Sequence, residues 1–351
     1  MLQRFLIFTL AITLVCVGVG FPADMTRSAA AEPRFPDLWP ELSELDGPDG
    51  QLIAFPSSSP FTLADAGSAP PEDAVGRLFL PRDASAQNPV PAVVLLHGAG
   101  GVISTREPTY AQQLANLGVA ALVVDSFAAR RDRAASFVER LLEITEVMLV
   151  ADAYAALAYL DSRPEVDADR VVLTGFSYGG MASTFALYSQ VAEALALNGR
   201  RFAGHVAFYA PCIARFVRTE TTGAPLLMLW GDGDAIVDPE RCAEIAEDLE
   251  GGGSSVESIV YPGAVHQWDG RFPGPRLIGR NLAPCSFRVD EDGIAWDRST
   301  FLPMLNRLLR QTTLGLCTDG EGYMIGRDDA VRALSNADLA SFLEDVFFTA
   351  D

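Results

Sequence analysis

The residues best placed to do chemistry surround Ser177, which stands in the pattern G-x-S-x-G at residues 175–179. Where a strand turns sharply into a helix, the two glycines let the chain bend without steric clash, and the turn exposes the serine hydroxyl. The helix that follows points the positive end of its dipole at any negative charge that develops there. The apolar run 171–174 and the alanine-rich segment after the pattern provide this setting. We therefore interpret Ser177 as a nucleophile; the alternative is a tight turn that carries an inert serine.

A serine hydroxyl is a weak nucleophile at neutral pH, so it needs a general base. For a nucleophile on this kind of turn, the order along the chain is serine, acid and then histidine. Of the three histidines, His97 precedes Ser177 and His205 begins a predicted strand, whereas His266 follows the last predicted strand. We therefore predict that His266 is the base.

The acid that orients this imidazole should follow an earlier strand of the same sheet. Asp232, Asp234 and Asp238 all come shortly after the apolar run 226–230. We predict that Asp234 is the acid and that Asp232 caps or turns the loop. The preceding predicted strand, 205–210, is followed by proline and cysteine without a carboxylate, which removes the other position for an acid.

The oxyanion of an acyl-transfer reaction needs two backbone N–H donors. One belongs to the residue after the nucleophile, which is Tyr178. The other should come from the sequence H-G-A-G-G at residues 97–101, where glycines let the backbone approach a substrate, and we favour Ala99. His97 itself is expected to hold this loop by hydrogen bonds beneath the site.

Strands and helices alternate along the chain, which is typical of βαβ units around a mostly parallel sheet with helices on both faces. Continuous apolar runs mark strands that are buried on both faces. The predicted strands are 52–55 (an edge strand), 75–80, 92–97, 119–125, 171–175, 205–210, 226–230 and 255–261, and the predicted helices are 137–158, 178–197, 239–250, 299–311 and 328–348. The sequence therefore predicts an α/β fold in one domain, residues 76–351, behind a proline-rich extension, residues 32–75.

The composition excludes several kinds of chemistry. The chain has 26 basic and 46 acidic residues, a net charge of −20, which argues against a nucleic acid partner. Every basic residue is arginine, so Schiff-base chemistry, a lysine base and a P-loop lysine are all excluded. Three histidines are too few for a histidine-rich metal site, and we predict no metal.

The first residues have the pattern of a secretory signal peptide, which we place at residues 1–31. Arg4 precedes an apolar run, 5–21, and the small residues 28–31 follow. We expect cleavage after Ala31 and a mature protein that is periplasmic or secreted. The alternative is an uncleaved membrane anchor, because the run has the length of a short membrane-spanning helix.

Because exported proteins enter oxidising compartments, the cysteines that remain in the mature chain can form disulfides. These are Cys212, Cys242, Cys285 and Cys317. An even count suggests two disulfides, and the spacing favours Cys212–Cys242 and Cys285–Cys317, each closing a loop of about thirty residues. The alternative is that one or more are buried free thiols.

From about residue 76 to the C-terminus, the chain resembles the dienelactone hydrolase family of α/β-hydrolases. The motifs that carry this resemblance are H-G-x-G-G at 97–101, V-D-S-F at 124–127 followed by Arg130, D-A at 152–153, G-F-S-Y-G-G at 175–180, G-x-x-D ending at Asp234 and G-A-x-H ending at His266. The family implies a compact α/β-hydrolase domain that hydrolyses small-molecule esters or lactones without a cofactor. Exported proteins of similar type carry one cysteine after a Tyr-x-Pro strand end and another in the next helix, which Cys212 and Cys242 match.

Three features bear on the substrate. The namesake enzymes use a cysteine nucleophile, so Ser177 favours a general carboxylic ester over dienelactone itself.

The segment 267–298 carries five arginines, and we favour a solvated insertion held by the Cys285–Cys317 pair over a segment that steers an anionic substrate. In this fold the loop that holds Arg130 faces the rim of the active site, so we hypothesise that Arg130 binds a substrate carboxylate.

We therefore interpret the chain as a serine hydrolase that cleaves carboxylic esters or lactones through an acyl-enzyme on Ser177. A serine peptidase of the same fold is one alternative, although prolyl-type peptidases usually carry a large additional domain. A non-catalytic binding protein is another, although it would be expected to have lost a member of the Ser-His-Asp set.

Overall fold

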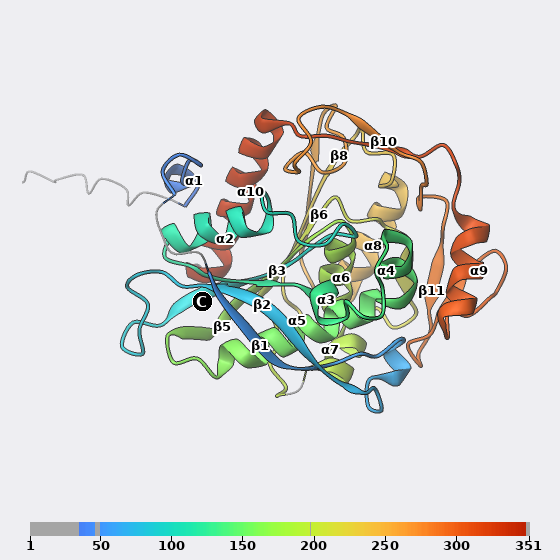
Figure 1. The fold of residues 1–351 in the computed structure, drawn as a ribbon, viewed down its shortest axis with the longest axis horizontal. Coiled ribbons are helices and arrows are strands. Elements are labelled where there is room, and N and C mark those ends of the chain that lie inside the picture. The colour runs from blue at the N-terminus through green and yellow to red at the C-terminus, as the bar shows by residue number, and fades with distance from the viewer. Residues whose placement is uncertain (1–34, 46–49, 197, 349–351) are drawn as a thin grey trace, which may run out of the picture. The chain divides into compact units, whose positions relative to one another are not determined.

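The structure is a computed structural model in which residues 35–45, 50–196 and 198–348 are described (Figure 1). The chain divides into two compact units, Met1–Pro33 and Arg34–Asp351. The predicted signal peptide lies outside the described residues. Within the described ranges, no helix is both long and apolar enough to cross a membrane.

An eight-stranded sheet runs through the second unit in the order β1-β2-β4-β3-β5-β6-β8-β9. β2 is antiparallel to both of its neighbours, and the other neighbouring strands are parallel. Every residue of β3, β4 and β6 is buried, as expected for apolar strands covered on both faces. The predicted α/β fold is thus confirmed. The strands of this sheet are β1 (Gln51–Ser58), β2 (Pro71–Phe79), β3 (Val90–Leu96), β4 (Ala120–Val124), β5 (Val166–Phe176), β6 (Gly204–Phe208), β8 (Leu226–Gly231) and β9 (Val256–Tyr261).

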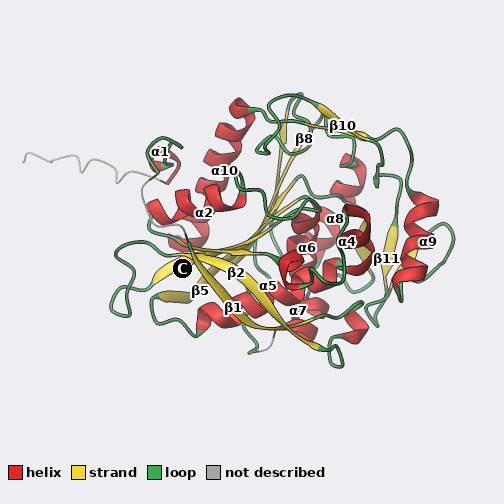
Figure 2. Cartoon of the chain, in the orientation of Figure 1, coloured by secondary structure: helices red, strands yellow, loops and turns green. Residues whose placement is uncertain are grey.

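Helices cover both faces of this sheet: α2 and α10 lie on one side, and α5 and α6 on the other (Figure 2). The helices are α1 (Phe35–Leu38), α2 (Glu107–Asn116), α3 (Ser126–Ala129), α4 (Phe137–Glu143), α5 (Glu146–Asp161), α6 (Tyr178–Ala186), α7 (Ser189–Leu195), α8 (Pro239–Gly251), α9 (Arg307–Cys317) and α10 (Asp329–Phe348), with a 3₁₀ turn at Leu63–Asp65.

Two of the predicted helices are split. The helix predicted over 137–158 becomes α4 and α5, and the one predicted over 178–197 becomes α6 and α7. Between α4 and α5, Ile144 has extended backbone, and its carbonyl accepts a hydrogen bond from the hydroxyl of Tyr178 at 2.9 Å. Apolar spacing continues across this break, so the pattern alone could not reveal it.

Part of the predicted N-terminal extension belongs to the sheet. β1 contains the predicted edge strand 52–55, and β2 begins at Pro71, ahead of the predicted boundary at residue 76. The hydroxyl of Ser57 donates to Asp152 at 2.7 Å, which ties this edge to α5. The sheet therefore starts earlier in the chain than the predicted domain boundary.

The chain between β9 and α10 folds over one end of the sheet, and we call residues 276–325 the cap. It contains β10 (Arg276–Ile278), β11 (Phe287–Val289), β12 (Ala295–Asp297), α9 and β13 (Tyr323–Ile325). β10 pairs with β13, and β11 joins β12 to β7 (Ala214–Phe216) in a small sheet. The prediction of a solvated insertion is therefore wrong in part, because Cys285 and Phe287 are buried. The helix predicted at 299–311 begins instead at residue 307, after the N-cap Asn306.

Two disulfides join the cysteines in the pairs that the spacing favours. Cys212 is bonded to Cys242, and Cys285 to Cys317. The first links the chain just after β6 to α8, and therefore closes a loop that contains β8. The second links two parts of the cap.

Candidate active site

Ser177 lies at the sharp turn between β5 and α6, with φ at +55°. The turn requires glycine on both sides: a Cβ on Gly175 would lie 1.9 Å from the carbonyl oxygen of Gly179. A Cβ on Gly179 would in turn lie 2.4 Å from the carbonyl oxygen of Leu96. The G-x-S-x-G pattern thus places the serine at the carboxyl end of the central strands, as the sequence predicts.

A chain of hydrogen bonds connects Ser177 to His266 and Asp234. Nε2 of His266 lies 2.9 Å from Oγ of Ser177, and Nδ1 lies 2.7 Å from Oδ2 of Asp234. The exposed fractions are 6% for Ser177, 0% for His266 and 4% for Asp234. The other oxygen of Asp234 accepts a hydrogen bond from the N–H of Ile236 at 3.2 Å, which fixes the carboxylate. This arrangement can pass the hydroxyl proton to an imidazole whose charge a carboxylate then offsets.

The two neighbouring aspartates have other partners. Asp232 accepts a hydrogen bond from the N–H of Gly263 at 2.5 Å, and so joins the loop after β8 to the loop after β9. Asp238 is the N-cap of α8, where it accepts from the N–H groups of Glu240 and Arg241. Of the three, Asp234 is the one that reaches the imidazole.

The glycine-rich loop at 97–101 packs directly against the nucleophile. A Cβ on Gly98 would lie 3.3 Å from the Cβ of Ser177. Among the residues that the structure describes, no hydrogen bond uses the backbone N–H of Ala99 or of Tyr178. His97 is buried beneath this loop, with Nδ1 2.8 Å from the carbonyl oxygen of Gly98. These contacts agree with a structural role for His97 and leave two N–H groups near the serine.

The remaining histidine also contacts a backbone carbonyl. His205 lies in β6, fully buried, with Nδ1 2.9 Å from the carbonyl oxygen of Ser183. Burial lowers the pKa of His205 to about 4, so the ring is neutral at neutral pH.

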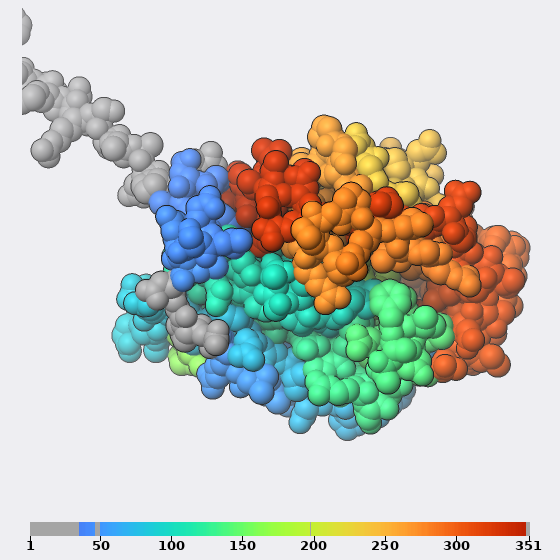
Figure 3. Space-filling model, turned by 45° about the horizontal axis from the view of Figure 1, so that its top comes forward, coloured from blue at the N-terminus to red at the C-terminus, as the bar shows by residue number. Residues whose placement is uncertain are grey.

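A cavity of about 430 Å³ opens beside Ser177. Its walls come from α4, α6 and the cap, and apolar side chains dominate them. Figure 3 shows the green segment that contains α4 and the orange segment of the cap lying on the same face. The favoured prediction, a solvated insertion, did not connect the cap with the site, whereas in the structure the cap forms one wall of it.

A buried ion pair lies in the same cavity wall. Arg310 of α9 donates to Glu146 at 2.8 Å and to the hydroxyl of Tyr178 at 3.2 Å. Burial alone would raise the pKa of Glu146, but the charge of Arg310 holds it below its ordinary value. Residues 146 and 310 are far apart in the sequence, and no local pattern could have paired them.

A second buried network, also missed from the sequence, supports the histidine. The ring of Tyr209 packs edge-on against His266 with 4.7 Å between centroids, and its hydroxyl donates to Asp269 at 2.6 Å. Arg106 donates to the same hydroxyl at 3.3 Å and pairs with Glu107 at 2.8 Å. Burial raises the pKa of Tyr209 well above its usual range, so its hydroxyl remains a donor. The network joins the histidine loop to the start of α2.

Comparison with known proteins identifies the family of the chain. The family model described as "Dienelactone hydrolase family" matches residues 76–273, which is more than half of the chain. The chain belongs to the dienelactone hydrolase family. It is accordingly a hydrolase, and the resemblance seen in the sequence is confirmed.

Individual relatives of this dienelactone hydrolase family member are distant. A probable 2-oxo-3-(5-oxofuran-2-ylidene)propanoate lactonase from Bradyrhizobium is 27% identical in an alignment of 203 residues that covers 52% of this chain and 75% of the relative. The putative hydrolase YtaP of Bacillus subtilis is 26% identical over 199 residues, covering 46% and 67%. Among solved structures, the butyrate-bound esterase Est2 of Thermogutta terrifontis shares the fold, with a TM-score of 0.53, 14% identity and coverage of 86% of this chain and 95% of that chain.

One predicted site residue of this family member does not reach the site. Arg130 is fully buried, and both ends of its guanidinium are held by Asp152, at 2.7 and 3.0 Å. The same group also donates to the hydroxyl of Ser59 and to the carbonyl oxygens of Ser58 and Ser126. The prediction that Arg130 binds a substrate carboxylate is therefore wrong, because its donors are already used to fasten β1 and α3 to α5.

Proposed function

We propose that this member of the dienelactone hydrolase family is a serine esterase that cleaves carboxylic esters or lactones through an acyl-enzyme on Ser177. The observation that carries the proposal is the chain of hydrogen bonds from Ser177 through His266 to Asp234. The proposed catalytic domain is residues 76–351, with the β1–β2 hairpin completing its sheet.

The first half of the reaction acylates the enzyme. Oγ of Ser177 attacks the ester carbonyl while Nε2 of His266 takes the hydroxyl proton. Asp234 holds the imidazole in the required orientation and offsets its positive charge. The N–H groups of Tyr178 and Ala99 donate to the oxyanion, and the tetrahedral intermediate collapses as His266 returns the proton to the leaving alcohol.

The second half releases the acid. Water enters the place of the alcohol, gives a proton to His266 and attacks the acyl carbon. The same two N–H groups stabilise the second oxyanion. When it collapses, the bond from the acyl carbon to Oγ breaks, and His266 returns its proton to Ser177. A lactone follows the same path. Its ring opens, so the alcohol that is released stays attached to the acyl group.

The test compares the mature protein with its Ser177→Ala variant on p-nitrophenyl butyrate. We expect kcat/KM to fall by about 10³-fold or more in the variant, because the residual rate then depends on binding and the oxyanion donors alone. A fluorophosphonate should label the wild-type protein at Ser177 and leave the variant unlabelled, while circular dichroism checks that both are folded. Equal activity in the two proteins, or labelling at another residue, would contradict the proposal.

A further inference from the structure

We infer that the natural substrate carries one bulky, uncharged apolar group, alkyl or aryl, which fills the cavity between α4, α6 and the cap. This inference rests on the proposed function, since it names the class of ester that the Ser177 site takes. It follows from the cavity's lining, from its charges and from the way in which the cap is held.

The walls of the cavity offer apolar contact on three sides. α4 contributes Phe137 and Leu141, and α6 contributes Met181, one turn beyond the nucleophile. The cap contributes Leu282, three residues before Cys285, and Leu314, three residues before Cys317. A volume of about 430 Å³ lies within the range of ~300–1,000 Å³ that is typical of small-molecule sites, and it exceeds what an acetyl group could fill. A small ester would leave most of this apolar wall in contact with water.

The charges in the lining do not favour a charged substrate. Glu146 and Arg310 neutralise one another, and Tyr178 completes their hydrogen bonds. Among the described residues, the other charged side chain in the lining is Arg280, which is exposed and donates to the hydroxyl of Thr318. A charged group in the interior would therefore be desolvated without a free partner, which is costly.

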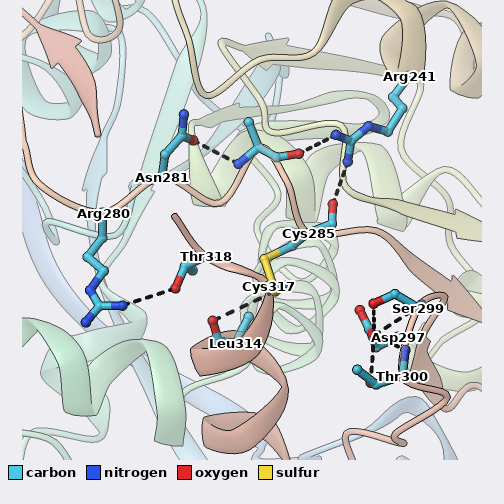
Figure 4. The surroundings of a disulfide bond; sticks show 11 residues. Arg241, Arg280, Asn281, Cys285, Asp297, Ser299, Thr300, Leu314, Cys317 and Thr318 are labelled. Carbon is cyan, nitrogen blue, oxygen red and sulfur yellow. Dashed lines mark hydrogen bonds between the residues drawn. A yellow bond between two sulfur atoms is a disulfide. The ribbon is translucent and has the colours of Figure 1, made fainter. Parts of the chain in front are cut away.

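The cap wall is fixed before any ligand arrives. Figure 4 shows the Cys285–Cys317 disulfide, with Arg241 of α8 donating to the carbonyl oxygen of Cys285 at 2.5 Å and to that of Ala283. Asn281 donates to the carbonyl oxygen of Ala235 at 2.8 Å, next to the proposed acid. A wall held in this way does not collapse onto a small substrate, so an apolar group that fills the cavity gains contact without ordering the loop.

A second, smaller cavity adjoins the first and bears on the size of the group. A smaller cavity of about 30 Å³ shares part of its lining with the main one. The shared residues are Glu146, Phe185, Val289, Ala295, Met304 and Arg310. Because an unbranched methionine adapts its shape easily, we expect Met304 to determine how long a chain the site accepts.

The experiment measures kcat/KM on p-nitrophenyl esters from acetate to dodecanoate, and on acetate esters of alcohols from ethyl to octyl. In one of the two series we expect at least a tenfold rise from two to six carbons, since each buried methylene is worth about fourfold (~0.8 kcal/mol). The rise should end at a maximum, and Met304→Ala should move that maximum to a longer chain. Values that stay flat or fall in both series would overturn the inference.

A matched pair of variants tests the cap wall. Leu314→Trp fills the cavity from α9, whereas Leu316→Trp adds the same bulk two residues away, where the side chain is 64% exposed and outside the lining. In the series that shows the rise, we expect Leu314→Trp to lower the ratio of kcat/KM for the eight-carbon ester to that for the two-carbon ester at least tenfold, and Leu316→Trp to leave both rates near wild type. Equal ratios in the two variants would contradict the assignment.

A binding measurement separates this inference from the proposed function. The Ser177→Ala variant should bind the eight-carbon ester of the series that shows the rise at least tenfold more tightly than the two-carbon ester, whether or not Ser177 is the nucleophile. Tighter binding of the eight-carbon ester without Ser177-dependent hydrolysis in the wild type would contradict the proposed function and leave the inference about the cavity standing. Ser177-dependent hydrolysis with equal binding of the two esters would do the reverse.

Discussion

Asp232 and Asp234 stand two positions apart, and their different partners set different consequences for the same substitution. Asp234→Asn keeps the size of the side chain but removes the charge that offsets the imidazolium, and its amide favours the wrong tautomer of His266. We expect kcat to fall by about 10³–10⁴-fold on p-nitrophenyl butyrate.

Asp232→Asn is the control for this prediction. An asparagine carbonyl can still accept the hydrogen bond from the N–H of Gly263, so the loop and the reaction should both be preserved. We expect kcat within about threefold of wild type. A larger loss for Asp232→Asn than for Asp234→Asn would show that the acid has been assigned to the wrong residue.

At this scale, the sequence predicted residues that depend on a local pattern or on chain order. Ser177 is marked by its glycines, and His266 by its place after the last strand. Arg130 was assigned wrongly because its partner Asp152 is brought beside it only by the packing of α3 on α5. Arg310 was missed for the same reason, since Glu146 lies 164 positions away. A motif tells which residue types a turn needs, but it does not tell which buried charges pair across the fold.

Among the elements, strands were easier to predict than helices and the cap. The apolar runs of β3, β4 and β8 are continuous because both faces of each strand are buried, and such runs are visible in the sequence. The short cap strands β10 to β13 have three residues each, too few for any periodicity to appear. The element that shapes the cavity was therefore the one that sequence reasoning described least well.

The Cys285–Cys317 disulfide gives a prediction for the cap as an element. Cys285→Ala with Cys317→Ala removes a link that closes a loop of 32 residues, which is worth about 3 kcal/mol of unfolding free energy. We expect a lower Tm, and a KM for p-nitrophenyl octanoate that rises about tenfold while the KM for acetate rises less, because a looser cap offers a poorer apolar wall. Calorimetry and the two KM values provide the measurement.

The other disulfide is the control for this double variant. Cys212→Ala with Cys242→Ala removes a link of similar span, 30 residues, that joins the chain after β6 to α8 and has neither end in the cap. We expect a comparable loss of Tm without the selective rise in the KM for octanoate. If both double variants change the ratio of the two KM values equally, the cap does not act through its disulfide.

For the whole chain, the acidic composition, the two disulfides and the pattern of residues 1–31 lead to one prediction. Disulfides form and persist in oxidising compartments, so the two pairs are expected only in an exported protein. Expression of the full chain in a host with a secretory pathway should yield a soluble protein that starts at Glu32, and its intact mass should be four hydrogens below that of the all-thiol chain. A protein that keeps its first residues and sediments with membranes would support an uncleaved anchor instead. Full alkylation of the four cysteines without prior reduction would reject the disulfides. The argument for export that rests on them would then fail.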